Sequence, residues 1–183
     1  MHKPMVGFGA SSMEGIGDEE GGGFFKRLQP AFDHHEFVNL GIGGHTTRDM
    51  LQRAGQLENY CPYDLIVLLG CNDYPRANDA NPEVRTSLEE YEQNLGRLLP
   101  AIRGQRSLFI TSFEVDPVRS GVSAATFERY ISRAREIAAA SGYEVLDLYR
   151  IIKDSGRDYL AADGVHFNAE GHQVIADLVQ AVL

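Results

Sequence analysis

The sequence predicts an α/β protein in which helices cover a parallel sheet. Short apolar runs alternate along the chain with longer segments whose apolar residues recur at helical spacing. The run at residues 65–69, Leu-Ile-Val-Leu-Leu, is apolar at every position, as expected of a central strand that is buried on both faces. The irregular stretches fall mainly after the apolar runs, at the edge where an open parallel sheet binds its ligands.

The expected elements follow this alternation along the chain. Strands are expected at residues 5–9, 37–40, 65–69, 107–111 and 143–147. Helices with clear apolar stripes are expected at residues 82–99, 124–140 and 169–182. The stripes, such as that of Leu88, Tyr91 and Leu95, are interpreted as core because regular helical spacing is typical of packing.

Length and composition favour a single domain over residues 1–183. A chain of 183 residues can bury most of its apolar surface around one core, and 43% hydrophobic and 23% charged residues are close to the globular average. The sequence shows no internal repeat, no biased tract and no linker rich in Pro, Gly and Ser.

The charge balance and the apolar runs limit the partners. Seventeen Lys and Arg against 26 Asp and Glu give a formal charge of −9, which repels phosphate backbones, so we expect no nucleic-acid partner. The sequence shows no leader and no apolar run long enough to span a bilayer, so we expect a cytoplasmic protein without a membrane span. Cys61 and Cys71 are expected as free, buried thiols. The oligomeric state has no signature in the sequence.

A serine directly follows the first predicted strand. Ser11 lies within residues 9–15, Gly-Ala-Ser-Ser-Met-Glu-Gly, between glycines that permit a tight turn. A serine in this place can be exposed as a nucleophile, although a small residue there is more often a turn residue or a helix cap. A catalytic serine therefore requires a base elsewhere in the chain.

The candidate base precedes the last predicted helix. Residues 163–166, Asp-Gly-Val-His, place an acid and an imidazole three residues apart. This spacing lets Asp163 orient the ring of His166, fix its tautomer and stabilise the imidazolium formed when it takes a serine proton. Taken alone, the pair is equally consistent with a turn that begins at an aspartate and a histidine that only packs.

Two further segments offer hydrogen-bond donors at the same edge. Residues 41–47, Gly-Ile-Gly-Gly-His-Thr-Thr, lead into a helix, and the Gly44 amide there could stabilise an oxyanion. Residues 70–73, Gly-Cys-Asn-Asp, follow the most apolar strand, and Asn72 is the best side-chain donor for an oxyanion hole.

Together the four segments resemble the SGNH (GDSL-like) hydrolase family. Its members carry Gly-Asp-Ser-x-x-x-Gly, a glycine block, Gly-x-Asn-Asp and Asp-x-x-His, and the corresponding segments occur here in the same order between Gly9 and Gly171. The resemblance implies a three-layer α/β/α flavodoxin-like fold with about five parallel strands in the order 2-1-3-4-5. The sequence departs from the family at Ala10, where aspartate is usual, and at Phe167, where proline is common. Loss of the aspartate is expected to affect rate and not reaction type.

The resemblance also implies the roles of the site residues. Ser11 is the expected nucleophile, Asp163 and His166 complete the triad, and the Ser11 and Gly44 amides with Asn72 form the oxyanion hole. The implied activity is hydrolysis of carboxylic esters through an acyl-enzyme, with no metal and no organic cofactor.

Substrate identity depends on loops that the four segments do not define. We expect a short-chain or small soluble ester, whereas the same segments also occur in thioesterases, lysophospholipases and carbohydrate O-deacetylases. Residues 71–81 and 113–121 are expected to form the pocket. The candidate substrate contacts are His45, Tyr74, Arg76, Phe113 and Arg119.

Other interpretations explain less of the sequence. Residues 7–12 imitate a dinucleotide-binding fingerprint, but Ser12 occupies its third glycine position. A metal hydrolase is another interpretation, but the sequence has no HExxH spacing. His34 and His35 are adjacent, so they cannot easily bind one ion together. A non-enzymatic flavodoxin-like binding module would share the fold. Cys71 has no neighbouring base and is interpreted as a packed thiol.

Overall fold

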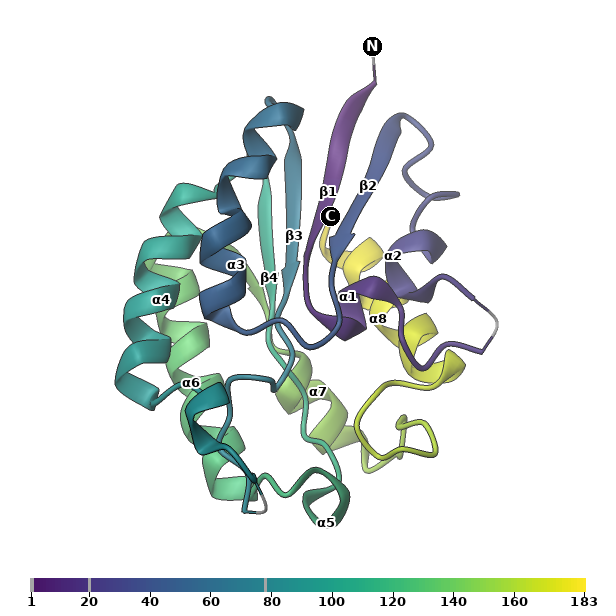
Figure 1. The fold of residues 1–183 in the computed structure, drawn as a ribbon. Helices are drawn as coiled ribbons and strands as arrows, with labels where there is room; N and C mark the ends of the chain where they lie inside the picture. The colour runs from purple at the N-terminus through teal and green to yellow at the C-terminus, as the bar shows by residue number, and fades with distance from the viewer. Residues whose placement is uncertain (1, 20, 78) are drawn as a thin grey trace.

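A parallel five-stranded sheet in the order β2-β1-β3-β4-β5 forms the centre of the computed structural model, which describes residues 2–19, 21–77 and 79–183 (Figure 1). The strands are β1 (Lys3–Gly9), β2 (His35–Gly41), β3 (Asp64–Leu68), β4 (Ser107–Ile110) and β5 (Glu144–Leu146). Every neighbouring pair is parallel, with β1 between β2 and β3. The predicted class, strand order and three-layer architecture are confirmed.

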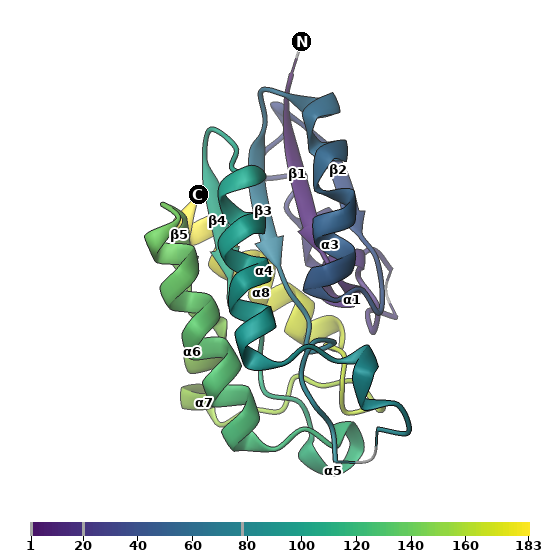
Figure 2. The ribbon, with the colours of Figure 1, turned by 60° about the vertical axis from the view of Figure 1, so that its left-hand side comes forward.

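Helices cover both faces of this sheet (Figure 2). The helices α3 (Thr47–Arg53), α4 (Leu88–Ala101) and α6 (Ala124–Ala140) pack side by side on one face. On the other face, α2 (Gly23–Arg27) and α8 (Ala169–Val182) pack together, as Figure 1 shows. The remaining helical segments are α1 (Ser11–Glu14), η1 (Ala54–Tyr60), η2 (Pro82–Val84), α5 (Pro117–Ser120) and α7 (Leu148–Ser155). Within the described ranges, no helix has both the length and the apolar character needed to cross a membrane.

The central position of β3 follows from its composition. The side chains from Leu65 to Leu68 are each at most 1% exposed, because β1 and β4 flank the strand and helices cover both of its faces. The edge strand β2 is only partly buried, which matches its mixed sequence. The segment with Asn72 therefore begins at the carboxyl end of a fully buried central strand.

Two predicted helices agree with the structure at both ends, and one does not. Residues 124–140 and 169–182 form α6 and α8. The helix predicted from residue 82 begins instead at Leu88, because the Ser87 hydroxyl accepts a hydrogen bond from the Glu90 amide and caps the first turn. Just before this cap, the Thr86 amide donates to the Asp73 carbonyl and is not available to a helix.

The two cysteines are free, but they differ in burial. Cys71 is buried, as predicted, and burial raises the pKa of its thiol. Cys61 is exposed, so the prediction that it is buried is wrong. It lies after η1 and before β3, at the amino-terminal edge of the sheet, where the chain turns at the surface.

Candidate active site

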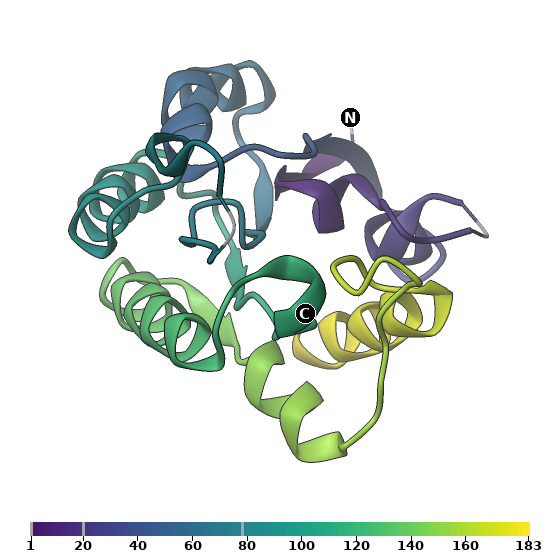
Figure 3. The same cartoon turned by 60° about the horizontal axis from the view of Figure 1, so that its bottom comes forward.

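The predicted site segments emerge from the carboxyl ends of the strands, at the lower side of Figure 1 and facing the viewer in Figure 3. Ser11 follows β1, Gly44 follows β2 and Asn72 follows β3. The loop with Asp163 and His166 leads into α8 at the same edge. Parallel strands end on one side of a sheet, so segments far apart in sequence meet there.

Ser11 begins α1, a single turn that two glycines make possible. A Cβ on Gly9 would lie 2.0 Å from the Leu68 carbonyl oxygen, so only glycine fits where β1 approaches β3. Gly15 ends the turn with a φ of +100°, which side chains rarely adopt, and its amide donates to the Ser11 carbonyl. Ser11 itself is 9% exposed. The serine therefore lies on a short, fixed turn directly at the sheet edge.

Asp163 and His166 form the acid–imidazole pair that the spacing predicted. Asp163 Oδ2 lies 2.6 Å from His166 Nδ1, and Oδ1 accepts the amides of Val165 and His166 at 2.8 and 2.9 Å. Burial favours a higher pKa for Asp163, but the hydrogen bonds from His166 and Val165 outweigh it and lower the pKa to about 2. The carboxylate is thus ionised at neutral pH and fixes the ring that it contacts.

The chain that follows Ser11 packs against His166. A Cβ on Gly17 would lie 2.8 Å from His166 Cβ and 2.2 Å from the Phe167 carbonyl oxygen. The Ile16 amide, one residue earlier, donates to the Ser11 carbonyl at 3.0 Å. The segment from 11 to 17 therefore connects the predicted nucleophile to the predicted base through direct contacts.

His172 holds this arrangement from inside the protein. It is 0% exposed, its Nδ1 accepts the Phe24 amide at 3.1 Å and its Nε2 donates to the Ile16 carbonyl at 3.2 Å. The bond in which Nδ1 accepts requires the neutral ring, and burial lowers the pKa of His172. His172 is therefore a packed interior residue that fixes the segment following Ser11.

The glycine block lies beside Ser11. A Cβ on Gly43 would be 3.9 Å from Ser11 Cβ, and the Gly43 amide donates to Glu14 Oε2 at 2.6 Å. Gly44 has a φ of +80° and is exposed, with nothing within 4 Å of where its Cβ would be. Its amide therefore belongs to an open stretch of backbone next to the serine.

Asn72 is tied to the same loop. Its Nδ2 donates to the His45 carbonyl at 3.0 Å. A side-chain amide has two N–H donors, so this bond leaves a second donor for another acceptor. The structure thus brings the predicted oxyanion donors Gly44 and Asn72 together at one loop.

Asp73, the last residue of the Gly-Cys-Asn-Asp segment, links the Asn72 segment to α3. It is 2% exposed and accepts hydrogen bonds from the Thr47 amide, the Thr47 hydroxyl and the Thr86 hydroxyl. These bonds fix the start of α3 to the segment that carries Asn72. The sequence signal for this role was the position of Asp73 directly after Asn72.

The prediction that Tyr74 contacts a substrate is wrong, because Tyr74 is 0% exposed. Its ring packs against Tyr91, Phe127 and Tyr130, with centroids 4.6 to 6.0 Å apart. The Tyr74 amide donates to the Cys71 carbonyl in a turn that directs the side chain inward. Tyr74 is therefore a core residue below the loop.

Of the other predicted contacts, His45, Arg76 and Arg119 lie closer to the surface, whereas Phe113 is buried. His45 and Arg76 are half-buried, and His45 Nδ1 accepts a hydrogen bond from Arg53. Arg119 is exposed and donates to the Ala162 carbonyl, next to the Asp163 loop. Phe113 is 3% exposed, and its ring contacts that of Phe167 in a tilted arrangement with centroids 3.7 Å apart. Of these side chains, Arg119 directly contacts the loop that presents Asp163.

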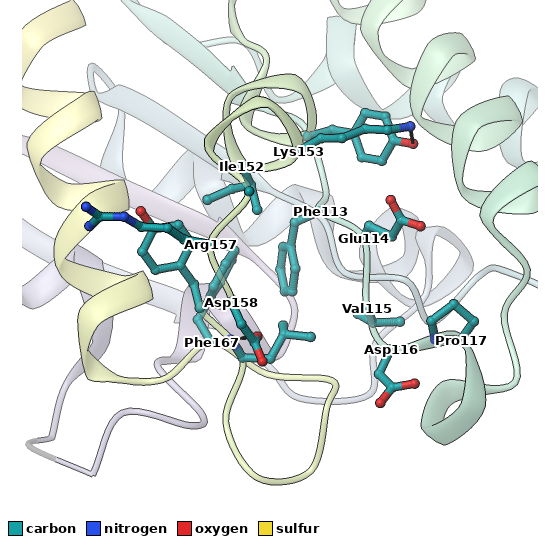
Figure 4. Close-up of a pocket in the computed structure, with 14 residues that line it drawn as sticks. Phe113, Glu114, Val115, Asp116, Pro117, Ile152, Lys153, Arg157, Asp158 and Phe167 are labelled. Carbon is teal, nitrogen blue, oxygen red and sulfur yellow. Dashed lines mark hydrogen bonds between the residues drawn. The ribbon is translucent and has the colours of Figure 1, made fainter.

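A cavity of about 380 Å³ lies beside the Asp163 loop (Figure 4). Residues 113–117 and part of the segment from 149 to 160 line it, and Phe167 contributes to its wall. The predicted triad and Asn72 do not line this cavity. The predicted catalytic residues therefore lie outside this cavity. Phe167, which lines the cavity, directly follows His166 in the sequence.

Comparisons with known proteins agree with this architecture. A family model described as the GDSL-like Lipase/Acylhydrolase family matches residues 7–174. The structure resembles a lipase/acylhydrolase from Enterococcus faecalis, with a TM-score of 0.83 and 23% identity over 98% of this chain and 94% of that one. It also resembles Axe2, an acetylxylan esterase from Geobacillus stearothermophilus, with a TM-score of 0.77 and 21% identity over 99% and 95% of the two chains.

A third similar structure is LAE5, an alpha/beta hydrolase enzyme from the metagenome of Lake Arreo, Spain. Its TM-score is 0.76 and its identity 25%, over 97% of this chain and 94% of that one. No curated protein matches the chain. The structural likenesses support the fold, and the family model covers most of the chain.

Proposed function

Because this chain belongs to the GDSL-like lipase/acylhydrolase family and is therefore an ester-hydrolysing enzyme, we propose that Ser11 is its nucleophile and that Asp163 and His166 complete the triad. Family membership also decides against a non-enzymatic binding module. The observation that carries the proposal is the 2.6 Å contact between Asp163 Oδ2 and His166 Nδ1. It assigns the Nδ1 proton to the bond with aspartate and leaves Nε2 of the neutral ring to accept a proton.

The proposed reaction proceeds in two steps. Ser11 Oγ attacks the ester carbonyl carbon while His166 takes the hydroxyl proton, and the tetrahedral intermediate collapses when His166 returns that proton to the leaving alcohol. Water then attacks the acyl-enzyme, with His166 as the base, and the acid and free Ser11 are released. The ionised Asp163 stabilises the imidazolium in both steps.

The proposed oxyanion hole comprises two backbone amides and one side chain. The Ser11 amide is at the first position of α1, where no intrahelical acceptor exists. The Gly44 amide lies in the open glycine loop, and Asn72 retains a second amide hydrogen. Donors fixed in this way stabilise negative charge on the carbonyl oxygen without reorganising during the reaction.

We propose short-chain carboxylic esters as substrates, with carbohydrate O-deacetylation as the second candidate. The second candidate is favoured by the structural likeness to acetylxylan esterases such as Axe2. The two candidate reactions are related, because both would place a small acyl group on Ser11. They differ in the alcohol that leaves. Thioester and lysophospholipid substrates are the remaining alternatives.

The test compares wild type with Ser11→Ala and His166→Ala on p-nitrophenyl acetate, butyrate and octanoate, with folding checked by circular dichroism. We expect turnover by the wild type, highest for the short esters, and loss in both folded variants. Equal activity in Ser11→Ala would exclude Ser11 as the nucleophile. Acetylated xylo-oligosaccharides, assayed by acetate release, separate the two substrate candidates.

A further inference from the structure

Arg53, the last residue of α3, contacts three segments that lead to the proposed site. Its Nη2 donates to the Gly9 carbonyl and its Nη1 to the Leu40 carbonyl, both at 2.8 Å. Its Nε donates to His45 Nδ1 at 3.2 Å. One guanidinium therefore binds the end of β1, the end of β2 and the loop between β2 and α3.

The hydrogen-bond acceptors of Arg53 are uncharged groups. The three hydrogen bonds go to two carbonyl oxygens and a ring nitrogen and not to carboxylates. The guanidinium carbon also lies 4.1 Å from the centroid of the Phe8 ring, a cation–π contact. Burial lowers the pKa of Arg53, with the charge of Asp49 opposing this effect. The protein thus holds a half-buried cation at a point where it satisfies backbone acceptors.

The acceptors are close in sequence to the proposed catalytic groups. Gly9 is separated from Ser11 only by Ala10, a fully buried methyl side chain that offers no polar group to hold the turn. The Gly9 carbonyl also accepts the Ile42 amide at 3.2 Å, which links β1 to the glycine loop. Arg53 therefore acts on the backbone that presents the nucleophile.

The contact with His45 extends to the oxyanion donors. A guanidinium only donates, so His45 Nδ1 must accept and, in the neutral ring, Nε2 carries the proton. The His45 carbonyl accepts Asn72 Nδ2, and the His45 amide donates to the Ile42 carbonyl. His45 therefore connects Arg53 to Asn72 and to the adjacent Gly44 backbone, so a displacement of Arg53 would also displace these two donors.

We propose that Arg53 is a positioning residue for the reaction proposed above, holding the Ser11 turn and the Gly44 loop at the spacing that the oxyanion hole requires. It touches no reacting atom. The inference rests on the proposed function for its effect on rate, but the contacts that define it can be measured independently. The planar guanidinium donates to its three acceptors from three separate nitrogens, whereas all N–H donors of lysine lie on one nitrogen.

The test uses Arg53→Ala and Arg53→Lys, with Arg133→Ala as the matched control. Arg133 also donates from all three of its guanidinium nitrogens, but to Glu92 and Glu136 on α4 and α6. We expect both Arg53 variants to lower kcat for p-nitrophenyl acetate by about 10- to 100-fold with little change in KM, since small misplacements of catalytic groups cost up to about 100-fold. Arg133→Ala is expected to retain the wild-type kcat.

Chemical rescue separates positioning from general stability. Ethylguanidinium at millimolar concentration should restore part of the kcat of Arg53→Ala, whereas ethylammonium at the same concentration should not. Wild-type kcat in both Arg53 variants, or a loss that only follows a lower Tm and is not rescued, would overturn the proposal.

Nuclear magnetic resonance tests the contacts without using activity. In the wild type, the His45 ring should show a protonated Nε2 and an unprotonated Nδ1, and Arg53→Ala should change this ring and shift the amides of residues 41–44. Unchanged ring and amide signals would overturn the proposal. If the wild type hydrolyses no ester and a phosphonate ester fails to label Ser11, the proposed function fails, and these spectra then decide by themselves whether Arg53 orders the two loops.

Discussion

The side chain of Asn72 donates to the carbonyl of His45 at 3.0 Å, so the loop after β3 is fixed to the loop after β2. The same amide group is proposed to stabilise the oxyanion with its second hydrogen. Asn72 therefore has both a structural and a chemical role at the sheet edge.

Asn72→Ala should lower kcat by about 10²- to 10³-fold, the effect of removing one oxyanion donor. The reason is loss of a donor that acts only when negative charge develops on the carbonyl oxygen. Steady-state kinetics on p-nitrophenyl acetate measure it, with circular dichroism to confirm the fold. A variant with the wild-type rate would remove Asn72 from the oxyanion hole.

Gly17→Ala should reduce kcat by about 100-fold, because misplacing a catalytic group by about 1 Å has this effect. The new Cβ would lie 2.2 Å from the Phe167 carbonyl oxygen and 2.8 Å from His166 Cβ, so the His166 segment or the segment that follows Ser11 must shift. Gly21→Ala is the matched control, since Gly21 has a similar φ of +85° but no atom within 4 Å of a Cβ. If both variants lose the same activity, backbone strain and not displacement of His166 is the cause.

Asp73→Asn should lower the free energy of unfolding by about 1–3 kcal/mol, the usual penalty for leaving buried partners unsatisfied. Its carboxylate accepts the amide and hydroxyl of Thr47 and the hydroxyl of Thr86, and an asparagine cannot accept all three in the same way. Urea denaturation measures the change. Asp158→Asn, which changes an exposed aspartate that accepts the Leu160 amide, should alter stability much less, and an equal loss would contradict the argument.

The stability of the wild type should fall as the pH drops below 6.5, the ordinary pKa of His172. The pKa of buried His172 is lowered in the folded state, so the unfolded state binds the proton first and acid favours unfolding until the folded pKa is passed. His172→Gln should be less stable at neutral pH but lose less stability on acidification. Denaturation at pH 7.5 and 5 tests this, and parallel losses in both proteins would exclude His172 as a cause.

The sequence predicted long elements better than short ones. α6 and α8 agree at both ends because an apolar stripe coincides with a capping residue, Ser123 in one case and Asn168 in the other. α1, α2 and α5 each have five residues or fewer, too short for any periodicity to appear. The start of α4 was placed too early because Thr86 bonds to Asp73, which is distant in sequence.

In the site too, contacts between residues close in sequence were predicted better than contacts between residues far apart in sequence. Asp163 and His166 pair as their spacing predicted, because that contact is local. Tyr74 was assigned to the pocket from its loop position, although its ring belongs to an aromatic cluster that only the folded chain assembles. Arg53 gave no signal, since two of its three acceptors are backbone carbonyls, which no residue type reveals.

The different burial of the two thiols makes Cys61 a selective point of attachment. A maleimide reagent should react with exposed Cys61, while burial protects Cys71 and raises its pKa. Cys61 precedes β3, so a dye or a solid support bound there would sit at the opposite end of the strand from Asn72. The enzyme could thus be immobilised in one orientation, with the carboxyl edge of its sheet facing the solution.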